Sequence, residues 1–198
     1  MKRQKARSAG LVKTALALAL LCAGLDPAAA RPIRIVAYGD SATSGWLVAR
    51  QDAYPAQLQA ALRWKKYDVV VENAGVPGDT LVSAMHRLDQ AIGPDTDIAL
   101  IEFGTNDLRS GATPATMHKR LAELIRVLKA RHIDVLVIGL GSLDLAAVAK
   151  AADVPYAQWK LPAHRYRARD GQHFNREGYA ILVARSLPQI EALIARRR

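Results

Sequence analysis

The chain has a single cysteine, and it lies near the N-terminus at position 22. The residues that follow it therefore cannot form a disulfide with one another. The same scarcity excludes a catalytic thiol and a cysteine-ligated metal from the rest of the chain. The fold and the chemistry must depend on other residue types.

No apolar run approaches the ~20 residues that a membrane-spanning helix needs. An apolar stretch of roughly a dozen residues near the N-terminus follows a basic start and ends before Ala28-Ala29-Ala30, which is the pattern of a secretory signal. The sequence therefore predicts a cleaved signal peptide over residues 1–30. It also predicts a secreted or periplasmic location and no stable membrane anchor.

Residues 31–198 are predicted to form a single domain, because 168 residues support one sizeable core and no linker or repeat interrupts them. The signal segment carries five basic residues and one acidic residue, so its removal lowers the formal charge from +10 to +6. No long basic stripe interleaved with aromatics is present, which argues against a nucleic-acid partner.

Short apolar runs rich in Val and Ile alternate with longer amphipathic ones, which is typical of a parallel sheet covered by helices. Five strands are predicted, at residues 33–38, 68–72, 97–103, 133–139 and 154–159. The expected fold is a three-layer α/β/α sandwich with a five-stranded parallel sheet. In such folds ligands bind beyond the carboxyl ends of the strands.

Three helices are predicted from apolar residues that recur at spacings of three and four. The first runs from Pro114 to Arg131 with Thr113 as its cap, the second opens at Asp79, and the third runs from Asn175. Pro188 is expected to kink the third.

Polar, glycine-bearing segments follow four of the predicted strands: "GDSATSG", "NAGVPGDT", "GTND" and "DGQHFN". Alone, Ser41 fits a helix cap, and Asp170 with His173 fits a surface pair. Together they supply the parts of nucleophilic acyl transfer. Ser41 would attack a carbonyl, His173 would take its proton, and Asp170 would orient the imidazole. Backbone N–H groups of Ser41 and Gly78, with the Asn106 side-chain amide, would bind the oxyanion.

These four blocks resemble those of the SGNH hydrolases, also called GDSL esterases, and the resemblance covers essentially the whole chain after residue 30. It is nearest to the small bacterial arylesterase, acyl-thioesterase and lysophospholipase branch, which has a flavodoxin-like sheet. It implies Ser41 as nucleophile, Gly78 and Asn106 as oxyanion donors, and Asp170 with His173 as the rest of the triad, with no metal and no cofactor. Small-molecule esters or thioesters, lipids and acylated glycans are the implied substrates. The sequence departs from the family in Ala42, Phe174 and a short segment at 139–153, which favours an open cleft.

The sequence alone leaves three functions open. The chain is a hydrolase of carboxylic esters or thioesters, an O-acetylesterase of cell-wall or plant polysaccharide, or a ligand-binding module on the same fold. The sequence has no glycine loop of the kind that binds phosphate in a nucleotide or flavin site.

Trp46 and Tyr54 line the acyl pocket or pack the first helix. Asp40 and Asp107 are expected to cap backbone N–H groups, and His86, His118 and His132 to lie on the surface or at an interface. The basic loop with Arg165, Arg167 and Arg169 is solvated or steers anionic substrates.

Overall fold

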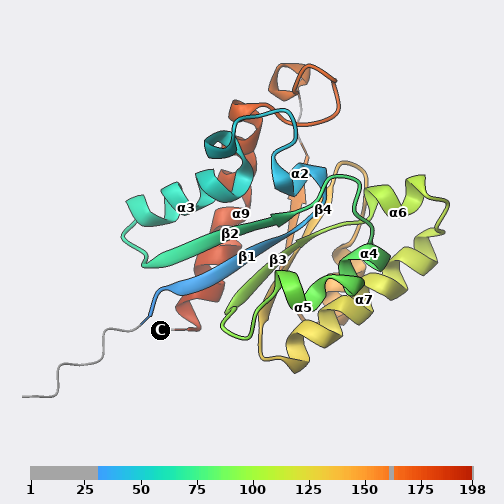
Figure 1. Ribbon diagram of the computed structural model, residues 1–198, viewed down its shortest axis with the longest axis horizontal. Helices are drawn as coiled ribbons and strands as arrows, with labels where there is room; N and C mark the ends of the chain where they lie inside the picture. The colour runs from blue at the N-terminus through green and yellow to red at the C-terminus, as the bar shows by residue number, and fades with distance from the viewer. Residues whose placement is uncertain (1–30, 161–162, 198) are drawn as a thin grey trace, which may run out of the picture. The chain divides into compact units, whose positions relative to one another are not determined.

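The computed structural model describes residues 31–160 and 163–197 (Figure 1). The predicted signal peptide, residues 1–30, lies outside the described residues. Within the part that is described, no helix has the length and apolar character of a membrane span.

A five-stranded parallel sheet in the order β2-β1-β3-β4-β5 forms the centre of the fold, which confirms the predicted architecture. In the centre of the sheet, Ile35 is in register with Val71 on one side and with Ile98 on the other. The chain moves outward from β1 to β2 and then crosses to β3 on the other side of β1, so the topological switch point lies at the carboxyl ends of β1 and β3. The strands are β1 (Ile33–Gly39), β2 (Val69–Gly75), β3 (Ile98–Glu102), β4 (Asp134–Leu140) and β5 (Tyr156–Trp159).

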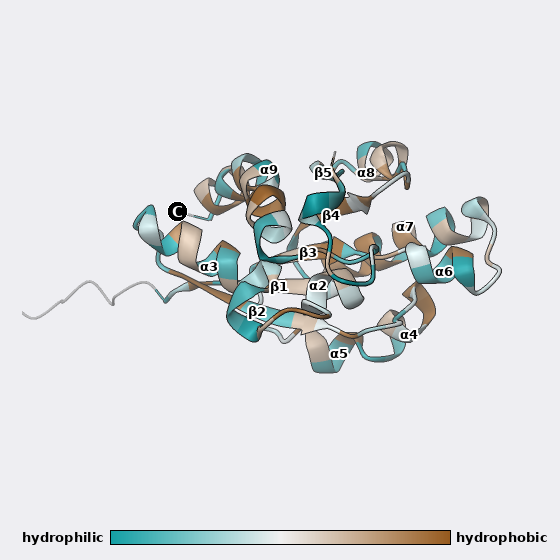
Figure 2. Cartoon of the chain, turned by 90° about the horizontal axis from the view of Figure 1, so that it is seen from above, coloured by the Kyte–Doolittle hydropathy of each residue, from teal (hydrophilic) through white to brown (hydrophobic). Residues whose placement is uncertain are grey.

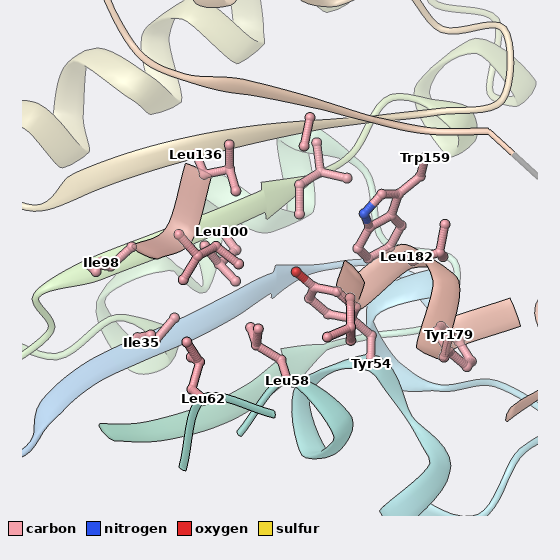
Figure 3. Packing of buried hydrophobic residues seen from close by; sticks show 14 of the residues in the cluster. Ile35, Tyr54, Leu58, Leu62, Ile98, Leu100, Leu136, Trp159, Tyr179 and Leu182 are labelled. Carbon is pink, nitrogen blue, oxygen red and sulfur yellow. The ribbon is translucent and has the colours of Figure 1, made fainter. Parts of the chain in front are cut away.

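Helices cover both faces of the sheet (Figure 1). One face packs against α3 (Tyr54–Trp64) and α9 (Arg176–Ala195), and Figure 3 shows side chains of both helices meeting those of β1, β3 and β4. The helices in Figure 2 carry both hydrophobic and hydrophilic residues, as expected when one side of a helix is buried. The opposite face packs against α4 (Leu81–His86), α5 (Leu88–Ala91), α7 (Pro114–Ala130) and α8 (Ala146–Ala151).

Short elements lie in the loops around the sheet. They are α2 (Ser41–Ser44), α6 (Thr105–Arg109) and the 3₁₀ turns η1 (Arg50–Asp52) and η2 (His164–Tyr166).

Two of the three predicted helices form as expected. Thr113 caps α7 by accepting a hydrogen bond from the N–H of Thr116, and Pro114 occupies the first turn, where its missing N–H costs nothing. Asn175 caps α9 in the same manner through the N–H of Gly178. The helix continues through Pro188 to Ala195, and its predicted apolar stripe is buried.

The prediction of one helix opening at Asp79 was wrong. Thr80 is the cap, and the chain forms two short helices, α4 and α5, on either side of Arg87. Arg87 has ψ of 11° and leaves helical geometry. Its guanidinium turns back to the Asp79 carboxylate at 2.6 Å and lies over the Tyr38 ring. The apolar spacing is kept across the break, because Leu81, Leu88 and Ile92 are all buried.

Candidate active site

Ser41 is the first residue of α2, directly after β1. Asp40 caps this helix by accepting a hydrogen bond from the N–H of Ala42 at 2.9 Å, which confirms its predicted role. The turn is tight, since a Cβ on Gly39 would lie 2.1 Å from the Thr43 hydroxyl oxygen. Glycine at 39 therefore allows strand, cap and helix to follow one another without a spacer, and it places Ser41 at the edge of the sheet.

The imidazole of His173 lies between Ser41 and Asp170. Its Nε2 is 2.8 Å from Ser41 Oγ, although the two residues are 132 positions apart in the sequence. Its Nδ1 is 2.5 Å from Asp170 Oδ2. The other oxygen of Asp170 accepts hydrogen bonds from the backbone N–H groups of Gln172 and His173, both at 3.0 Å. A hydroxyl, an imidazole and a carboxylate thus stand in one hydrogen-bonded row.

The Asp170 carboxyl group is held in its ionised form. The hydrogen bond from His173 lowers its pKa to about 2; desolvation opposes this shift, and the two backbone N–H groups contribute to it. An ionised Asp170 accepts from Nδ1–H, which leaves Nε2 as the acceptor that faces the Ser41 hydroxyl.

Asn106 also lies at this edge of the sheet, on α6. Its side-chain amide donates to Asp40 Oδ2 at 2.9 Å and to the carbonyl oxygen of Asp79 at 3.0 Å. Both N–H groups of the amide are therefore engaged in this state. Ser41, Asn106 and His173 line one small hollow of about 50 Å³, together with Asp40, Ala42, Thr105, Arg109, Leu140, Gln172 and Phe174.

Gly78 is separate from this group. It is exposed in the turn between β2 and α4, and it is not among the residues that line the hollow. A Cβ there would meet nothing within 4 Å, so crowding does not explain the glycine. Its φ of +82° does, because L side chains rarely adopt that conformation.

Asp107 is a cap, as predicted, but for another element. Its Oδ2 accepts from the N–H of Leu81, the first residue of α4, and its Oδ1 is 3.4 Å from Arg120. Because Asp107 follows Asn106, this contact fixes α6 against the start of α4 and helps to hold Asn106 in place.

Glu102 was not singled out from the sequence, although it is the last residue of β3 and is only 1% exposed. Its Oε2 accepts a hydrogen bond from the Thr43 hydroxyl at 3.0 Å. Burial raises the pKa of this carboxyl group well above its ordinary value, and the neighbouring Asp40 charge raises it further. The pKa of Asp40 is also raised, chiefly by burial. An acidic residue inside the apolar run "IALIEF" was the signal that could have revealed it.

Aromatic and basic residues around the site divide into core and rim. Tyr54 is fully buried, and its hydroxyl lies 2.7 Å from Ser186 Oγ, so it packs the core rather than the site. Trp46 is 49% exposed. Arg109 donates to the Gln172 side chain at 2.7 Å, and Arg167 donates to the Gln172 carbonyl and lies over the Phe174 ring.

Two of the three histidines that were predicted to lie on the surface are exposed. His86 and His132 are exposed, and His118 is partly buried on α7. Among the residues that the structure describes, no group of three or more His, Cys, Asp or Glu side chains has the arrangement of a metal site. Residues 139–153, which the sequence left undefined, form the end of β4, a turn and α8, and Ala149 of α8 is buried in the core beside α7.

Known proteins similar to this chain are esterases. An arylesterase of Vibrio mimicus is 30% identical over 106 residues, which is 53% of each chain. Esterase TesA of Pseudomonas aeruginosa is 31% identical over 131 residues, 66% of this chain and 63% of the relative. The chain thus spans between half and two thirds of the length of these relatives. A crystal structure of TesA has a TM-score of 0.72 at 23% identity over 81% of this chain and 99% of that one, a likeness of fold.

A family model also matches residues 37–159, which include Ser41, Gly78 and Asn106 but end before Asp170 and His173. The match covers more than half of the chain, from within β1 to the end of β5. The chain belongs to the GDSL-like lipase/acylhydrolase family, a family of ester-bond hydrolases.

Proposed function

We propose that this chain is a serine esterase that cleaves carboxylic esters or thioesters through an acyl-enzyme on Ser41. The observation that carries the proposal is the row Ser41–His173–Asp170, with contacts of 2.8 and 2.5 Å. Nucleophile, base and orienting carboxylate are within hydrogen-bond reach before any substrate is bound. The family relationship supports the same chemistry.

In the first half of the reaction, Ser41 Oγ bonds to the carbonyl carbon and its proton passes to His173 Nε2. Asp170 remains ionised throughout and stabilises the imidazolium that forms. Collapse of the tetrahedral intermediate breaks the bond to the leaving group, which takes the proton from Nε2 as alcohol or thiol. The reaction scheme uses no metal and no cofactor.

In the second half, water attacks the acyl-enzyme and gives its proton to His173 Nε2. The carboxylic acid then leaves as the proton returns to Ser41 Oγ. In both halves the oxyanion would accept from the N–H of Ser41 and the amide of Asn106, which line the hollow, and the turn between β2 and α4 would have to bring the Gly78 N–H to the same oxygen as a third donor. The Asn106 amide already donates to Asp40 and to Asp79, so the oxyanion would share or replace one of these acceptors.

Short acyl groups fit this site best. The hollow beside Ser41 holds about 50 Å³, whereas ligand pockets commonly hold ~300–1,000 Å³. The short segment at residues 139–153 forms α8, which packs on the sheet face next to α7. An acetyl group on a cell-wall or plant polysaccharide is the second candidate substrate, since its small acyl part fits the same hollow and its bulky part would lie outside. Acyl lipids with long chains are less suited.

The nucleophile is tested with a serine-directed fluorophosphonate and with p-nitrophenyl acetate, with EDTA present throughout. Wild type should be labelled on Ser41 and should hydrolyse the ester, while Ser41→Ala should lose both properties. Ser110→Ala changes an exposed serine at the end of α6 and serves as the matched control. A ligand-binding module without turnover would show neither labelling nor hydrolysis in wild type, and full activity in Ser41→Ala would disprove the proposal.

Substrate class is tested with the same purified protein. A series of p-nitrophenyl esters from acetyl to decanoyl should show the highest kcat/KM at the short end. The rate of acetate release from acetylated xylan or peptidoglycan is measured in the same experiment. Comparison of this rate with that for p-nitrophenyl acetate decides whether a small ester or an acetylated glycan is the better substrate. Preference for the longest esters would contradict the inference drawn from the small hollow.

Residues 1–30 are proposed to direct export to the periplasm or beyond. The proposal depends on the sequence pattern of that segment. N-terminal sequencing of the protein recovered from the periplasmic fraction of a bacterial host should begin at Arg31. Full-length protein found only in the cytosol would contradict it.

A further inference from the structure

The floor of the site contains a carboxyl group that the reaction scheme does not use. We define the floor as Asp40, Thr43, Glu102 and Asn106, which lie at the ends of β1 and β3. Glu102 is in register with Gly39, the residue before Asp40, so these two acidic residues come from adjacent strands at the switch point. Asp40 and Glu102 are 2% and 1% exposed.

Among the described residues, Glu102 has one side-chain hydrogen-bond donor and no cation. The Thr43 hydroxyl donates to Oε2, while Oε1 is buried with no hydrogen-bond partner within standard geometry among the described residues. No Lys, Arg or His in the described part of the chain forms an ion pair with Glu102. An ionised carboxylate in such a place is costly, because burial removes its hydration and the Thr43 hydroxyl replaces only part of it. The group is therefore a neutral carboxylic acid, in agreement with its raised pKa.

Asp40 is the acceptor available to that acid. Asp40 directly follows Gly39, which is in register with Glu102, and after burial the Asp40 charge is the next cause that raises the pKa of Glu102. Asp40 itself accepts from the Ala42 N–H and from the Asn106 amide, both at 2.9 Å, and accepts weakly from Ser41 Oγ at 3.5 Å. These donors favour the ionised form of Asp40. Two adjacent buried carboxyl groups do not both ionise, so the proton stays on Glu102.

We propose that Glu102 is a positioning residue, a carboxylic acid that donates to Asp40 and thereby fixes the Asn106 amide beside Ser41. The proposed bond from Glu102 to Asp40 would connect two hydrogen bonds that the structure has, from Thr43 to Glu102 at 3.0 Å and from Asn106 to Asp40 at 2.9 Å. The hydrogen bond from Glu102 also withdraws charge from Asp40, which weakens its competition with an oxyanion for the Asn106 N–H. This role rests on the proposed function, because only an oxyanion gives the orientation of Asn106 a catalytic consequence.

Loss of the Glu102 proton should disrupt this arrangement. The titratable groups around Glu102 are Asp40 from the β1–α2 turn and Tyr179 from α9. The charge of His173 also lowers the pKa of Asp40. Tyr179 donates to the Ala42 carbonyl, and its pKa is raised by burial, so it stays neutral and supplies no compensating charge. Two carboxylates would then repel each other beneath α2, and the contact between Asp40 and Asn106 would change.

The test compares Glu102→Gln with Glu102→Leu, using kcat and KM for p-nitrophenyl acetate across the alkaline range. Glutamine keeps both interactions of the acid, since its carbonyl accepts from Thr43 and its amide donates to Asp40. It should keep kcat within about threefold of wild type, whereas leucine, which keeps the volume but donates nothing, should lower kcat by roughly 10- to 100-fold with little change in KM. Wild type should lose activity on the alkaline side at a lower pH than Glu102→Gln.

Ser186→Ala is the control for a purely structural effect. Ser186 is a buried polar residue of α9, and its hydroxyl bonds to Tyr54 rather than to the site. The Ser186→Ala substitution should lower thermal stability and leave the pH dependence of kcat unchanged. If Glu102→Leu does not fold, the pH comparison between wild type and Glu102→Gln still decides the matter.

If kcat of wild type and kcat of Glu102→Gln fall at the same alkaline pH, the proposal is overturned. Full kcat in a folded Glu102→Leu variant would also overturn it. Fluorophosphonate labelling of Ser41 in the same samples separates this failure from failure of the esterase proposal. If the positioning role is wrong, Ser41→Ala is still inactive; if the esterase proposal is wrong, Ser41→Ala is as active as wild type.

Discussion

The wall and the floor of the site both contain carboxyl groups, and the chain holds them in different ways. We define the wall as Asp170, Gln172 and His173 in the loop before α9. The hydrogen bonds that Asp170 accepts come from residues at most three positions away, and its side chain is 28% exposed. The floor, by contrast, is built from the ends of two adjacent strands, and its hydrogen bonds join residues 59 and 66 positions apart.

This difference determines which carboxyl group is charged. The wall surrounds Asp170 with N–H donors, and its pKa falls to about 2. The floor surrounds Glu102 with apolar strands and a second acid, and its pKa rises. The wall thus supplies a fixed negative charge next to the base, and the floor supplies a neutral donor behind the oxyanion amide.

The largest expected effect comes from removing the charge of the wall. Asp170→Asn should lower kcat by roughly 10³- to 10⁴-fold, because the asparagine amide donates to Nδ1 and forces the imidazole into the wrong tautomer. The loop should keep its shape, since the asparagine oxygen still accepts from Gln172 and His173. Steady-state rates with p-nitrophenyl acetate measure the loss.

Asp144→Asn is the matched control for this substitution. Asp144 also accepts from the backbone N–H two residues ahead, at Ala146, and lies in the turn before α8. Its replacement should leave kcat unchanged. An Asp170→Asn variant with more than about a tenth of wild-type kcat would show that the wall carboxylate only shapes the loop.

The next largest effect should come from the floor. Asn106→Ala removes the amide donor and should lower kcat by about 10²- to 10³-fold with a small change in KM, because the oxyanion exists only along the reaction path. Asn73→Ala removes an exposed amide that donates to the Ser44 carbonyl and accepts from the Gly75 N–H, away from the hollow, and it should retain nearly full kcat. A change in KM with an unchanged kcat in Asn106→Ala would contradict the assignment of Asn106 as an oxyanion donor.

The wall and the floor should also give opposite pH dependence of stability. Asp170 has a folded pKa below its ordinary 3.8, so its contribution to stability is present above that pH and is lost as the pH falls toward about 2. Glu102 has a folded pKa above its ordinary 4.5, so the native state binds the extra proton above that pH. Stability is therefore lost as the pH rises from 4.5 to the folded pKa.

Chemical denaturation of wild type and Glu102→Gln from about pH 4 to about pH 8 measures the second effect. The free energy of unfolding of Glu102→Gln minus that of wild type should grow by up to about 1.4 kcal/mol per pH unit, the value for one bound proton. Ser186→Ala should differ from wild type by an amount that does not depend on pH. A constant difference for Glu102→Gln would mean that Glu102 is ionised in the native state.

Local patterns allowed most of the fold to be predicted. The runs of Val and Ile gave five strands, and the spacing of apolar residues from Met117 to Leu128 gave α7. The same spacing predicted one helix where α4 and α5 form two. The break at Arg87 depends on an ion pair with Asp79 and on the Tyr38 ring, a tertiary contact that apolar periodicity does not report.

The site was predicted only in part, for the same reason: local motifs indicated some residues, and tertiary contacts determine the others. Ser41, Asp170 and His173 stand in short motifs, and the rule that ligands bind beyond strand ends predicted that they meet. Their catalytic roles stay predictions until the variants are measured. The floor was missed because the partner of Glu102 follows from the register of β1 with β3, in which Gly39 lies opposite Glu102. The amide of Asn106 was expected to face a substrate, and only its surroundings reveal that Asp40 already accepts from it.

The smallest expected effect concerns Arg109, which joins the rim of the hollow to the wall. Its guanidinium donates to the neutral side chain of Gln172, and no ion pair of Arg109 is present in residues 31–160 and 163–197. The charge is therefore available to a substrate at the mouth of the site. Arg109→Gln should lower kcat/KM for the anionic ester p-nitrophenyl hemisuccinate by about three- to tenfold more than for the neutral p-nitrophenyl butyrate.

Added salt should reduce this selectivity in wild type, since exposed charges are screened. Arg126→Gln serves as the control, because Arg126 pairs with Glu123 on α7 and does not line the hollow. Equal losses on both esters in Arg109→Gln would mean that Arg109 only braces Gln172 and the wall. In that case the charge selects no substrate, and the wall contributes to catalysis solely through Asp170 and His173.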